Sequence, residues 1–429
     1  IEVSDMMSKQ GEIGTGAPAL RTSGREQRIL RAGFIPLMDA SILIAAAEMG
    51  FAAREGLTLD LVRDVSWANV RDRLAFRQFD IAHMLSPMPV ASMLDLGSNP
   101  SPTITPFSLG RGGNAITLSL RLYERMRAYA DLAEDAGALD NAKALAAVLS
   151  DMRQKGEQPP TFGMTYPFSS HNYEFRYWLA AGGVDPDRDV KLVVVPPPLT
   201  TDALAAGAID GFCVGAPWNM VASERGVGRI VAAKQDIWPS APEKVVGMRP
   251  DWAKSNVDTV SRLIVALDAS ARWCDQPENH DHLSAILASP RYITAPQDII
   301  RRVLAGEFSL DAFGNRRVIR DYFVFHRQAA NFPQTNQALW IYSQMIRWGQ
   351  VEFSSENLRR AQSAYRADLY TQALGTAAIL PDEASVLPGA TPGDRFMDGR
   401  VFDPDRMQEY IQGFAVRSDR KPSRSNGED

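Results

Sequence analysis

Residues 28–240 alternate between buried-strand patterns and helix patterns, and this alternation constrains the fold more than any other feature of the chain. The first series has strand patterns at RILRAGFIPL, LTLDLVRD and FDIAHML, each followed by a helix pattern. The second series repeats the arrangement with QPPTFGMTYP, VKLVVVPPP and GFCVG. Strand–helix–strand units of this length favour largely parallel sheets. The chain is therefore predicted to be an α/β protein with two lobes.

The two lobes are expected to be joined by two crossings, near TITPFSL and near VVGMRP. A double crossing makes a hinge, and a ligand would lie in the cleft between the lobes, outside the carboxyl ends of the strands. From residue 251 onward the pattern becomes mainly helical. The predicted parts are a polar leader at 1–27, lobe 1 at 28–110 and 241–330, lobe 2 at 111–240, a helical part at 331–416 that packs on lobe 1, and a disordered tail at 417–429.

Composition excludes several classes of protein. The 429 residues have a net charge of −5, so no direct nucleic-acid binding is expected. No apolar run reaches the roughly 18 residues that a membrane span needs, so no membrane insertion is expected. The two cysteines, Cys213 and Cys274, give neither a disulfide framework nor a metal-ligand spacing, and they are interpreted as buried core side chains.

Motifs for catalysis are missing from the sequence. RGGNA is glycine-rich but is not G-x-G-x-x-G, and neither a Walker A lysine nor a G-x-S-x-G elbow is present. His280 and His282 lack a third metal ligand, and His326 lies in an apolar segment, where packing or capping is the simpler role. The sequence therefore predicts no enzyme activity, no catalytic residue, no metal and no cofactor.

Helix starts that directly follow strands give a better signal, and it is one for binding. Trp67 follows the expected N-cap Ser66, and Ser169 and Ser170 lead into His171. Two further joints of this kind lie in AHMLSPMP and CVGAPWN, so four helix N-termini could form a cradle for an anion. Each residue also has a simpler interpretation: Trp67 as core packing and His171 as a cap.

Three other residues have simple structural interpretations on sequence alone. Asp39 has the position of an N-cap for the helix in DASILIAAAEMG. Lys244 would ordinarily be a solvated loop lysine, and Asn114 could simply shape a turn.

Six segments together resemble the nitrate/bicarbonate-binding (NrtA/CmpA-like) family of ABC-transporter solute receptors: SWANVRDRL, FDIAHMLSPMP, GNAITLS, HNYEFRYWLAAGGVDPDRDVKLVVVPPP, DGFCVGAPWN and PEKVVG. The similarity runs in one register over about 28–275 and more loosely through the C-terminal part. It implies a bilobed periplasmic-binding-protein fold (type II, Venus-flytrap) with hinged lobes and a helical C-terminal extension, closing on a small oxyanion. Carried over by motif, the ligand-binding residues would be Trp67, Asn114, His171 and Lys244.

The resemblance also implies the ligand. Nitrate only accepts hydrogen bonds, so Lys244 would supply charge, Asn114 and His171 donors, and Trp67 a flat wall. Family members that bind bicarbonate tend to have a carboxylate where Lys244 stands, so nitrate or nitrite is expected. The chain departs from the family at Asn114, where nitrate receptors usually have glutamine, and at Ala216, where they often have glutamate.

Two roles are compatible with the resemblance. The sequence starts at Ile1, and residues 1–27 have neither a secretory pattern nor a lipid-attachment cysteine. This favours a cytoplasmic regulatory protein closest to the NasS-type nitrate/nitrite sensors, which controls nitrate-assimilation genes by holding an RNA-binding NasT-type antiterminator and releasing it on ligand binding. The alternative is a periplasmic nitrate-binding receptor of an ABC uptake transporter.

Two further expectations concern chemistry and stability. An enzyme resembling the pyrimidine-biosynthesis relatives of these receptors would need a cofactor or a reactive lysine–histidine site, and no motif for one is present. Lys244→Ala is expected to leave the fold intact and to abolish the response to nitrate.

Overall fold

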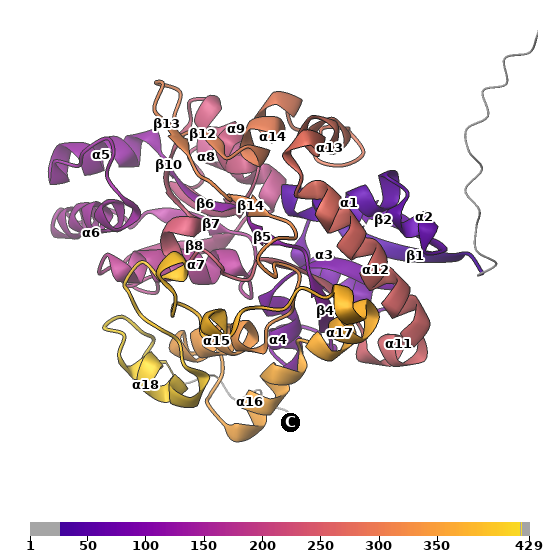
Figure 1. Ribbon diagram of the computed structural model, residues 1–429. Helices are drawn as coiled ribbons and strands as arrows, with labels where there is room; N and C mark the ends of the chain where they lie inside the picture. The colour runs from indigo at the N-terminus through magenta and orange to yellow at the C-terminus, as the bar shows by residue number, and fades with distance from the viewer. Residues whose placement is uncertain (1–25, 421, 423–429) are drawn as a thin grey trace, which may run out of the picture.

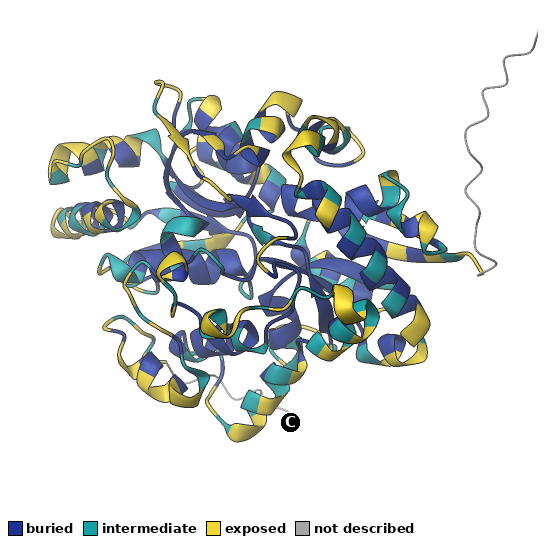
Figure 2. Cartoon of the chain, viewed as in Figure 1, coloured by how far each residue is buried: buried dark blue, intermediate teal, exposed yellow. Residues whose placement is uncertain are grey.

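Two five-stranded sheets, one in each lobe, form the centre of the molecule (Figure 1). The structure is a computed structural model, and it describes residues 26–420 and 422. The first sheet has the order β2-β1-β3-β11-β4, and the second has the order β10-β6-β9-β7-β8. Figure 2 shows that both sheets are largely buried, whereas exposed residues gather on the outer helices and loops. The predicted α/β fold with two lobes is therefore confirmed.

Lobe 1 contains the strands of the first series and one strand that follows lobe 2. Its strands are β1 (Arg28–Phe34), β2 (Leu57–Arg63), β3 (Ile81–Leu85), β4 (Ile104–Ser108) and β11 (Lys244–Met248). β1 is parallel to β2 and β3, whereas β11 is antiparallel to β3 and β4. Its helices are η1 (Met38–Ala40), α1 (Ser41–Glu48), α2 (Phe51–Arg54), α3 (Trp67–Ala75), α4 (Pro87–Met93), α11 (Pro250–Ser255), α12 (Val257–Cys274) and α13 (His280–Leu287).

Lobe 2 repeats this architecture with the second series. Its strands are β6 (Asn114–Ser119), β7 (Thr161–Met164), β8 (Lys191–Val194), β9 (Gly211–Gly215) and β10 (Gly228–Ala233). β7 is parallel to β8 and β9, and β6 is antiparallel to β9 and β10. Its helices are α5 (Leu120–Ala130), α6 (Ala138–Gln154), α7 (Ser170–Ala181), α8 (Thr200–Ala205), α9 (Trp218–Glu224) and α10 (Lys234–Ile237).

The crossings between the lobes lie beside the predicted segments rather than in them. TITPFSL and VVGMRP contribute β4 and β11, because both are apolar enough to be buried inside the first sheet. The chain crosses after β4 through β5 (Arg111–Gly112), which pairs with β14 (Phe323–Val324), and it returns just before β11. Gly112 has a φ of +98°, and a Cβ there would lie 1.6 Å from the carbonyl oxygen of Tyr322. Only glycine fits this close approach.

The segment after α13 contacts lobe 2 as well as lobe 1, unlike the predicted boundaries. α14 (Gln297–Leu304) packs beside α9, and β12 (Glu307–Ser309) pairs with β13 (Arg316–Val318). This segment contacts lobe 2 because β10 is the edge strand of the second sheet and has free backbone groups to pair. The amide of Ile230 in β10 donates to the carbonyl of Leu310, at a distance of 2.9 Å.

The C-terminal part also packs on both lobes, although the sequence predicted packing on lobe 1 alone. Its helices are α15 (Thr335–Arg347), α16 (Ser355–Ser363), α17 (Ala367–Leu374) and α18 (Met407–Gln412). α17 lies against α12 and β4 of lobe 1. In contrast, Trp340 of α15 packs against Trp238 and Tyr177 of lobe 2. α15 is buried around most of its circumference, so both lobes are needed to cover it.

Two predicted segments lie partly outside the described residues. Of the polar leader at 1–27, residues 1–25 are not described, and of the tail at 417–429, residues 421 and 423–429 are not described. Within the described part of the chain, no helix is both long and apolar enough to cross a membrane.

Candidate functional site

The four residues predicted to bind ligand lie together between the lobes, and all are buried. Asn114, His171 and Lys244 are 0% exposed, and Trp67 is 1% exposed. Lys244 begins β11 opposite Leu85, the last residue of β3, and Asn114 begins β6 opposite Gly215, the last residue of β9. The site is therefore built at the carboxyl ends of strands from both sheets, as expected for this class of fold.

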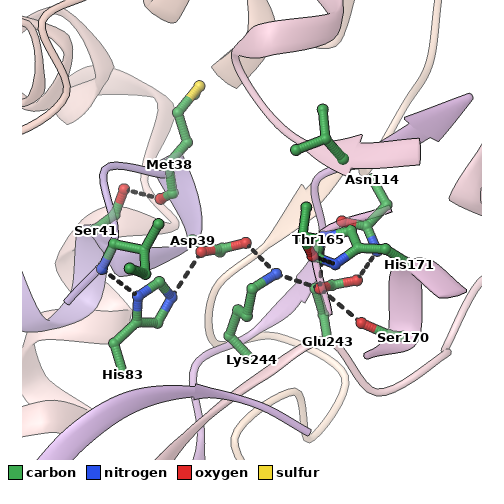
Figure 3. Close-up of polar contacts among 12 residues, drawn as sticks. Met38, Asp39, Ser41, His83, Asn114, Thr165, Ser170, His171, Glu243 and Lys244 are labelled. Atoms are coloured by element: carbon green, nitrogen blue, oxygen red, sulfur yellow. Dashed lines mark hydrogen bonds and ion pairs between the residues drawn. The ribbon is translucent and has the colours of Figure 1, made fainter. Parts of the chain in front are cut away.

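Lys244 is held between two buried carboxylates, so it is not a solvated loop lysine (Figure 3). Its Nζ lies 2.8 Å from Asp39 Oδ2, and it also forms an ion pair with Glu243 Oε1. Burial opposes the charge of the lysine, but Asp39 and Glu243 outweigh burial, and the pKa of Lys244 is raised. The ammonium also lies 5.8 Å from the centre of the Trp67 ring, within the range of a cation–π contact.

Asp39 does not cap a helix, contrary to the sequence interpretation. It lies in η1, α1 begins at Ser41, and the side chain of Asp39 is turned into the site instead. Its Oδ1 accepts a hydrogen bond from His83 Nε2 at 2.8 Å. Burial alone would raise the pKa of Asp39, but Lys244 and His83 lower it to about 2. Asp39 is turned toward Lys244 rather than toward the start of α1 because a buried carboxylate is stabilised by a nearby positive charge.

His83 has a fixed tautomer because of its two partners. Its Nδ1 accepts a hydrogen bond from the backbone amide of Ile35 at 3.2 Å, so the proton is on Nε2 and is donated to Asp39. Burial lowers the pKa of His83, which keeps the ring neutral at pH 7. In lobe 1, the hydrogen bond from His83 thus fixes the orientation of the Asp39 carboxylate that pairs with Lys244.

His171 is positioned by α7, and the cap of this helix is Ser169 rather than His171. Ser169 Oγ accepts from the amide of Asn172 at 3.0 Å. His171 Nδ1 lies 2.8 Å from Thr165 Oγ1, and Nε2 lies 3.9 Å from Glu243 Oε1 without a hydrogen bond. Burial lowers the pKa of His171 well below its ordinary value, so the ring is neutral. A carboxylate facing Nε2 favours the proton on that nitrogen, which leaves an N–H donor without a partner.

Asn114 donates both of its N–H groups to glutamate carboxyl groups. Its Nδ2 donates to Glu174 Oε2 at 2.9 Å and to Glu243 Oε2. The amide therefore cannot donate to a ligand in this arrangement, although the sequence predicted a donor. Asn114 Oδ1 has no hydrogen-bond partner among the described residues, so the group that remains free is an acceptor. A Cβ on Gly215 would lie 3.6 Å from this oxygen, so a small residue leaves room beside it.

Several buried polar atoms of the site have no hydrogen-bond partner within the described residues. They are Trp67 Nε1, His171 Nε2, Asn114 Oδ1 and Glu174 Oε1. Buried polar atoms are almost always paired, so a cluster of unpaired ones needs an explanation. Two N–H donors beside an ammonium group are suited to a small molecule with several acceptor oxygens.

Sequence reasoning missed the acidic half of the site. Glu243 directly precedes the predicted Lys244. Glu174 follows His171 by three residues, so His171 and Glu174 lie on the same face of α7. These two spacings were the available signals. Nothing in the sequence indicates that His83, in the middle of the apolar strand β3, would orient Asp39.

The remaining predicted features have structural roles. Trp218 starts α9 and donates from Nε1 to the carbonyl of Pro36 at 3.2 Å, which links the two lobes. His280 contacts the carbonyl of Cys274, and His326 contacts Asp268. Among the described residues, no group of three or more His, Cys, Asp or Glu side chains could hold a metal ion. Both cysteines are buried and free, as predicted.

Comparison with known proteins agrees with this architecture. The model of the NMT1-like family matches residues 23–288. The nitrate import ATP-binding protein NrtC of Synechocystis is 33% identical over 420 residues, which are 96% of this chain and 59% of that protein. The nitrate/nitrite binding protein NrtA of Synechococcus elongatus is 31% identical over 423 residues, which are 95% of this chain and 91% of that protein. The chain thus spans little more than half of the ATP-binding relative but most of NrtA.

A solved structure supports the same assignment. The crystal structure of the periplasmic nitrate-binding protein NrtA from Synechocystis superposes with a TM-score of 0.81 at 27% identity, covering 90% of this chain and 98% of that one. The resemblance read from the sequence motifs is confirmed at the level of the family. This chain belongs to the NMT1-like family and, within it, to the NrtA/CmpA-like solute-binding proteins of bilobed periplasmic-binding-protein fold.

Proposed function

We propose that this protein binds nitrate or nitrite between its two lobes, at the ammonium group of Lys244. The observation behind this proposal is that two buried nitrogen atoms beside a buried lysine, Trp67 Nε1 and His171 Nε2, have no hydrogen-bond partner in the described part of the chain. Trp67 Nε1 is an N–H donor, and the carboxylate that faces His171 Nε2 favours a proton there as well. Leaving such donors unpaired is costly, and a small anion with only acceptor oxygens would pair with them. The names of the relatives NrtA and NrtC support the same ligand class.

We further propose that the protein serves as the solute receptor of an ABC importer. NrtC is named as an import protein, and the solved NrtA is named as periplasmic, so these relatives favour the transporter role and a periplasmic location. The expected partners are then the membrane and ATP-binding subunits of the importer. The cytoplasmic sensor that holds a NasT-type antiterminator stays a prediction, and it is the less well supported of the two roles.

Bicarbonate is a second candidate ligand, because of the acceptors in the site. Sequence reasoning disfavoured bicarbonate on the ground that a carboxylate would stand in place of Lys244. Here Lys244 is present together with the carboxylates of Asp39 and Glu243, and Asn114 Oδ1 is an unpaired acceptor. Bicarbonate has an O–H group that such an acceptor could bind.

The first experiment is isothermal titration calorimetry of the dialysed protein with sodium nitrate, nitrite and bicarbonate at pH 7, with sodium chloride as the control for ionic strength. Saturable one-to-one binding of nitrate or nitrite is expected. Binding of bicarbonate alone would replace the proposed ligand by the second candidate. If none of the three anions binds, the proposed function is wrong.

A second experiment separates the two roles. The gene sequence upstream of Ile1 is read for a secretory signal, which the receptor role requires and the sensor role excludes. In parallel, the purified protein is mixed with a NasT-type antiterminator with and without nitrate. Complex formation that nitrate reverses would support the sensor and overturn the receptor role.

A further inference from the structure

The site contains more carboxylates than an anion-binding site should tolerate. Asp39, Glu174 and Glu243 are each no more than 2% exposed, and the ammonium of Lys244 already pairs with two of them. A bound monoanion would add another negative charge at the same ammonium. In a buried environment such an uncompensated charge is strongly unfavourable. Some group must therefore be neutralised before the anion can bind.

The geometry identifies where neutralisation occurs. Glu174 from α7 and Glu243 from the crossing before β11 converge on one nitrogen, Asn114 Nδ2. Two carboxylates that share one donor repel each other, and such pairs hold a single proton between them.

The carboxyl groups of Glu174 and Glu243 differ in the number of hydrogen bonds that they accept. Glu243 accepts hydrogen bonds from Asn114, from Lys244 and, at 3.0 Å, from Ser170 Oγ. In contrast, Glu174 accepts only from Asn114, and its Oε1 has no partner among the described residues. Hydrogen bonds stabilise the ionised form, so Glu243 is the carboxylate and Glu174 is the acid. Burial, with the charge of Glu243 added to it, raises the pKa of Glu174 to about 8.

We propose that Glu174 is a neutral carboxylic acid in this buried site and that the anion binds only while Glu174 holds this proton, which comes from solvent. This inference rests on the proposed function, since it specifies how the same site accepts its anion. With Glu174 neutral, the ammonium groups of Lys244 and Lys234 balance the carboxylates of Asp39 and Glu243. A monoanion then adds one charge, whereas a dianion such as sulfate adds two.

The groups that face Glu174 and Glu243 come from every element packed around them. The titratable groups that interact with one or both glutamates are Asp39 of η1, His171 of α7, Cys213 of β9, Lys234 of α10, Lys244 of β11 and Tyr322. Three more groups act on these neighbours: His83 of β3 on Asp39, and Arg111 of β5 and Asp394 of η6 (Pro392–Asp394) on Lys234.

Lys234 is the main competitor for the proton. It is 1% exposed, donates to the carbonyl of Pro239 at 2.7 Å, and forms no ion pair with a described residue. Burial lowers its pKa to about 8, the same range as that of Glu174. The two residues therefore have to be separated by experiment.

The test is calorimetric titration of the wild-type protein with sodium nitrate from pH 6.5 to 9.5, in two buffers of different ionisation enthalpy at each pH. Nitrate does not titrate in this range, so any proton taken up from the buffer on binding is taken up by the protein. Uptake approaching one proton per nitrate is expected at pH 9, with Kd rising about tenfold per pH unit above pH 8. The variant Glu174→Gln should bind without proton uptake and with a flat pH profile, whereas Lys234→Met should retain the uptake.

Two results of these titrations would overturn the inference. If nitrate binds to the wild type with no proton uptake at any pH, Glu174 is not linked to binding. If uptake persists in E174Q and disappears in K234M, the proton belongs to Lys234. Infrared difference spectra between wild type and E174Q test protonation of Glu174 without any ligand. Absence of a protonated carboxyl band at pH 7 overturns the inference whether or not an anion binds. Failure of all anions to bind while this band is present overturns the proposed function and the link between the proton and binding, but not the neutral state of Glu174.

Discussion

The two lobes contribute opposite halves to the same site. In lobe 1, His83 is fixed by the Ile35 amide and by Asp39, which in turn pairs with Lys244. In lobe 2, the side chains of His171 and Asn114 each retain an atom that has no hydrogen-bond partner in residues 26–420 and 422. Lobe 1 is thus a preformed charged half, whereas lobe 2 retains groups for a ligand and a proton. The comparison shows that two lobes of similar architecture can have different roles in one site: one supplies the charged groups, and the other supplies the groups that recognise the ligand.

The largest expected effect comes from breaking the charged half at Lys244. Lys244→Met leaves Asp39 and Glu243 buried without their cation, so the unfolding free energy should fall by about 3–5 kcal/mol, and nitrate binding should be lost. This differs from the sequence-based expectation that removal of Lys244 leaves the fold intact. Urea unfolding at pH 7 measures the change.

The matched control for Lys244 is a lysine on the surface. Lys254 lies exposed on α11, so Lys254→Met should change stability by less than about 0.5 kcal/mol. If K244M is as stable as K254M, Asp39 and Glu243 do not depend on the charge of Lys244, and lobe 1 is not a preformed charged half.

The next effect tests Trp67, the exception in lobe 1, because its Nε1 is unpaired. Trp67→Phe removes this donor and keeps an aromatic ring. Loss of one hydrogen bond to an anion should weaken nitrate binding by about 1.5–3 kcal/mol, or roughly 10- to 150-fold. Calorimetric titration measures it.

Trp238 offers a matched control for this substitution. Its ring is 1% exposed and its Nε1 also lacks a partner among the described residues, but its ring packs against Trp340 and Phe396 of the C-terminal part, whereas the Trp67 ring lies against Lys244. Trp238→Phe should leave nitrate binding unchanged. Equal weakening by W67F and W238F would show that the loss comes from packing rather than from the donor.

The third effect concerns the proton held in lobe 2. The pKa of Glu174 is raised from 4.5 to about 8 in the folded protein, so the folded state retains a proton that the unfolded state has lost. Stability should therefore fall as pH rises from 6.5 to 8, by at most about 1.4 kcal/mol per pH unit. Below pH 6.5 the neutral His83 and His171 oppose this trend, because the unfolded state then binds more protons.

Urea unfolding at pH 6.5, 7.2 and 8 checks this slope. Glu174→Gln should remove it, whereas Glu356→Gln, at an exposed position on α16, should retain it. An identical slope in wild type and E174Q would mean that Glu174 is ionised throughout this range.

Local patterns made the fold predictable, and long-range packing limited the prediction. Apolar runs such as VKLVVV identified strands, and Ser66 and Ser169 identified the starts of α3 and α7, because both signals depend only on neighbouring residues. The partners of α15 were not predictable, since a helix that is buried around most of its circumference does not specify which lobe covers each face. The placement of 331–416 on lobe 1 alone failed for this reason.

The residues of the site also fall into a group that local motifs predicted and a group that they did not. Trp67, Asn114, His171 and Lys244 were found through family motifs, and the structure brings them together. Asp39, Glu174 and Glu243 were missed because an acidic residue usually lies on the surface, whereas these three are buried between the lobes. The donor role expected of Asn114 also changed, since its amide is used on carboxylates that the sequence did not place there.

The smallest expected effect compares how the two lobes start their helices. Ser66 and Ser169 each accept a hydrogen bond from the third residue after them, at 3.1 and 3.0 Å. Removing either cap should cost about 0.5–2 kcal/mol. Ser169 is fully buried and also donates to the carbonyl of Tyr166 at 2.6 Å, so Ser169→Ala should cost more than Ser66→Ala.

The readout that matters is binding relative to stability. Ser354 caps α16 with the same geometry, its Oγ accepting from the amide of Asn357 at 3.0 Å, but it lies outside the site. Ser354→Ala should lower stability and leave nitrate binding unchanged. Because α7 positions both His171 and Ser170 at its first turn, Ser169→Ala should weaken binding by more than Ser66→Ala does. If S169A and S354A have equal effects on binding, the start of α7 is merely structural, and lobe 2 positions its groups through the sheet instead.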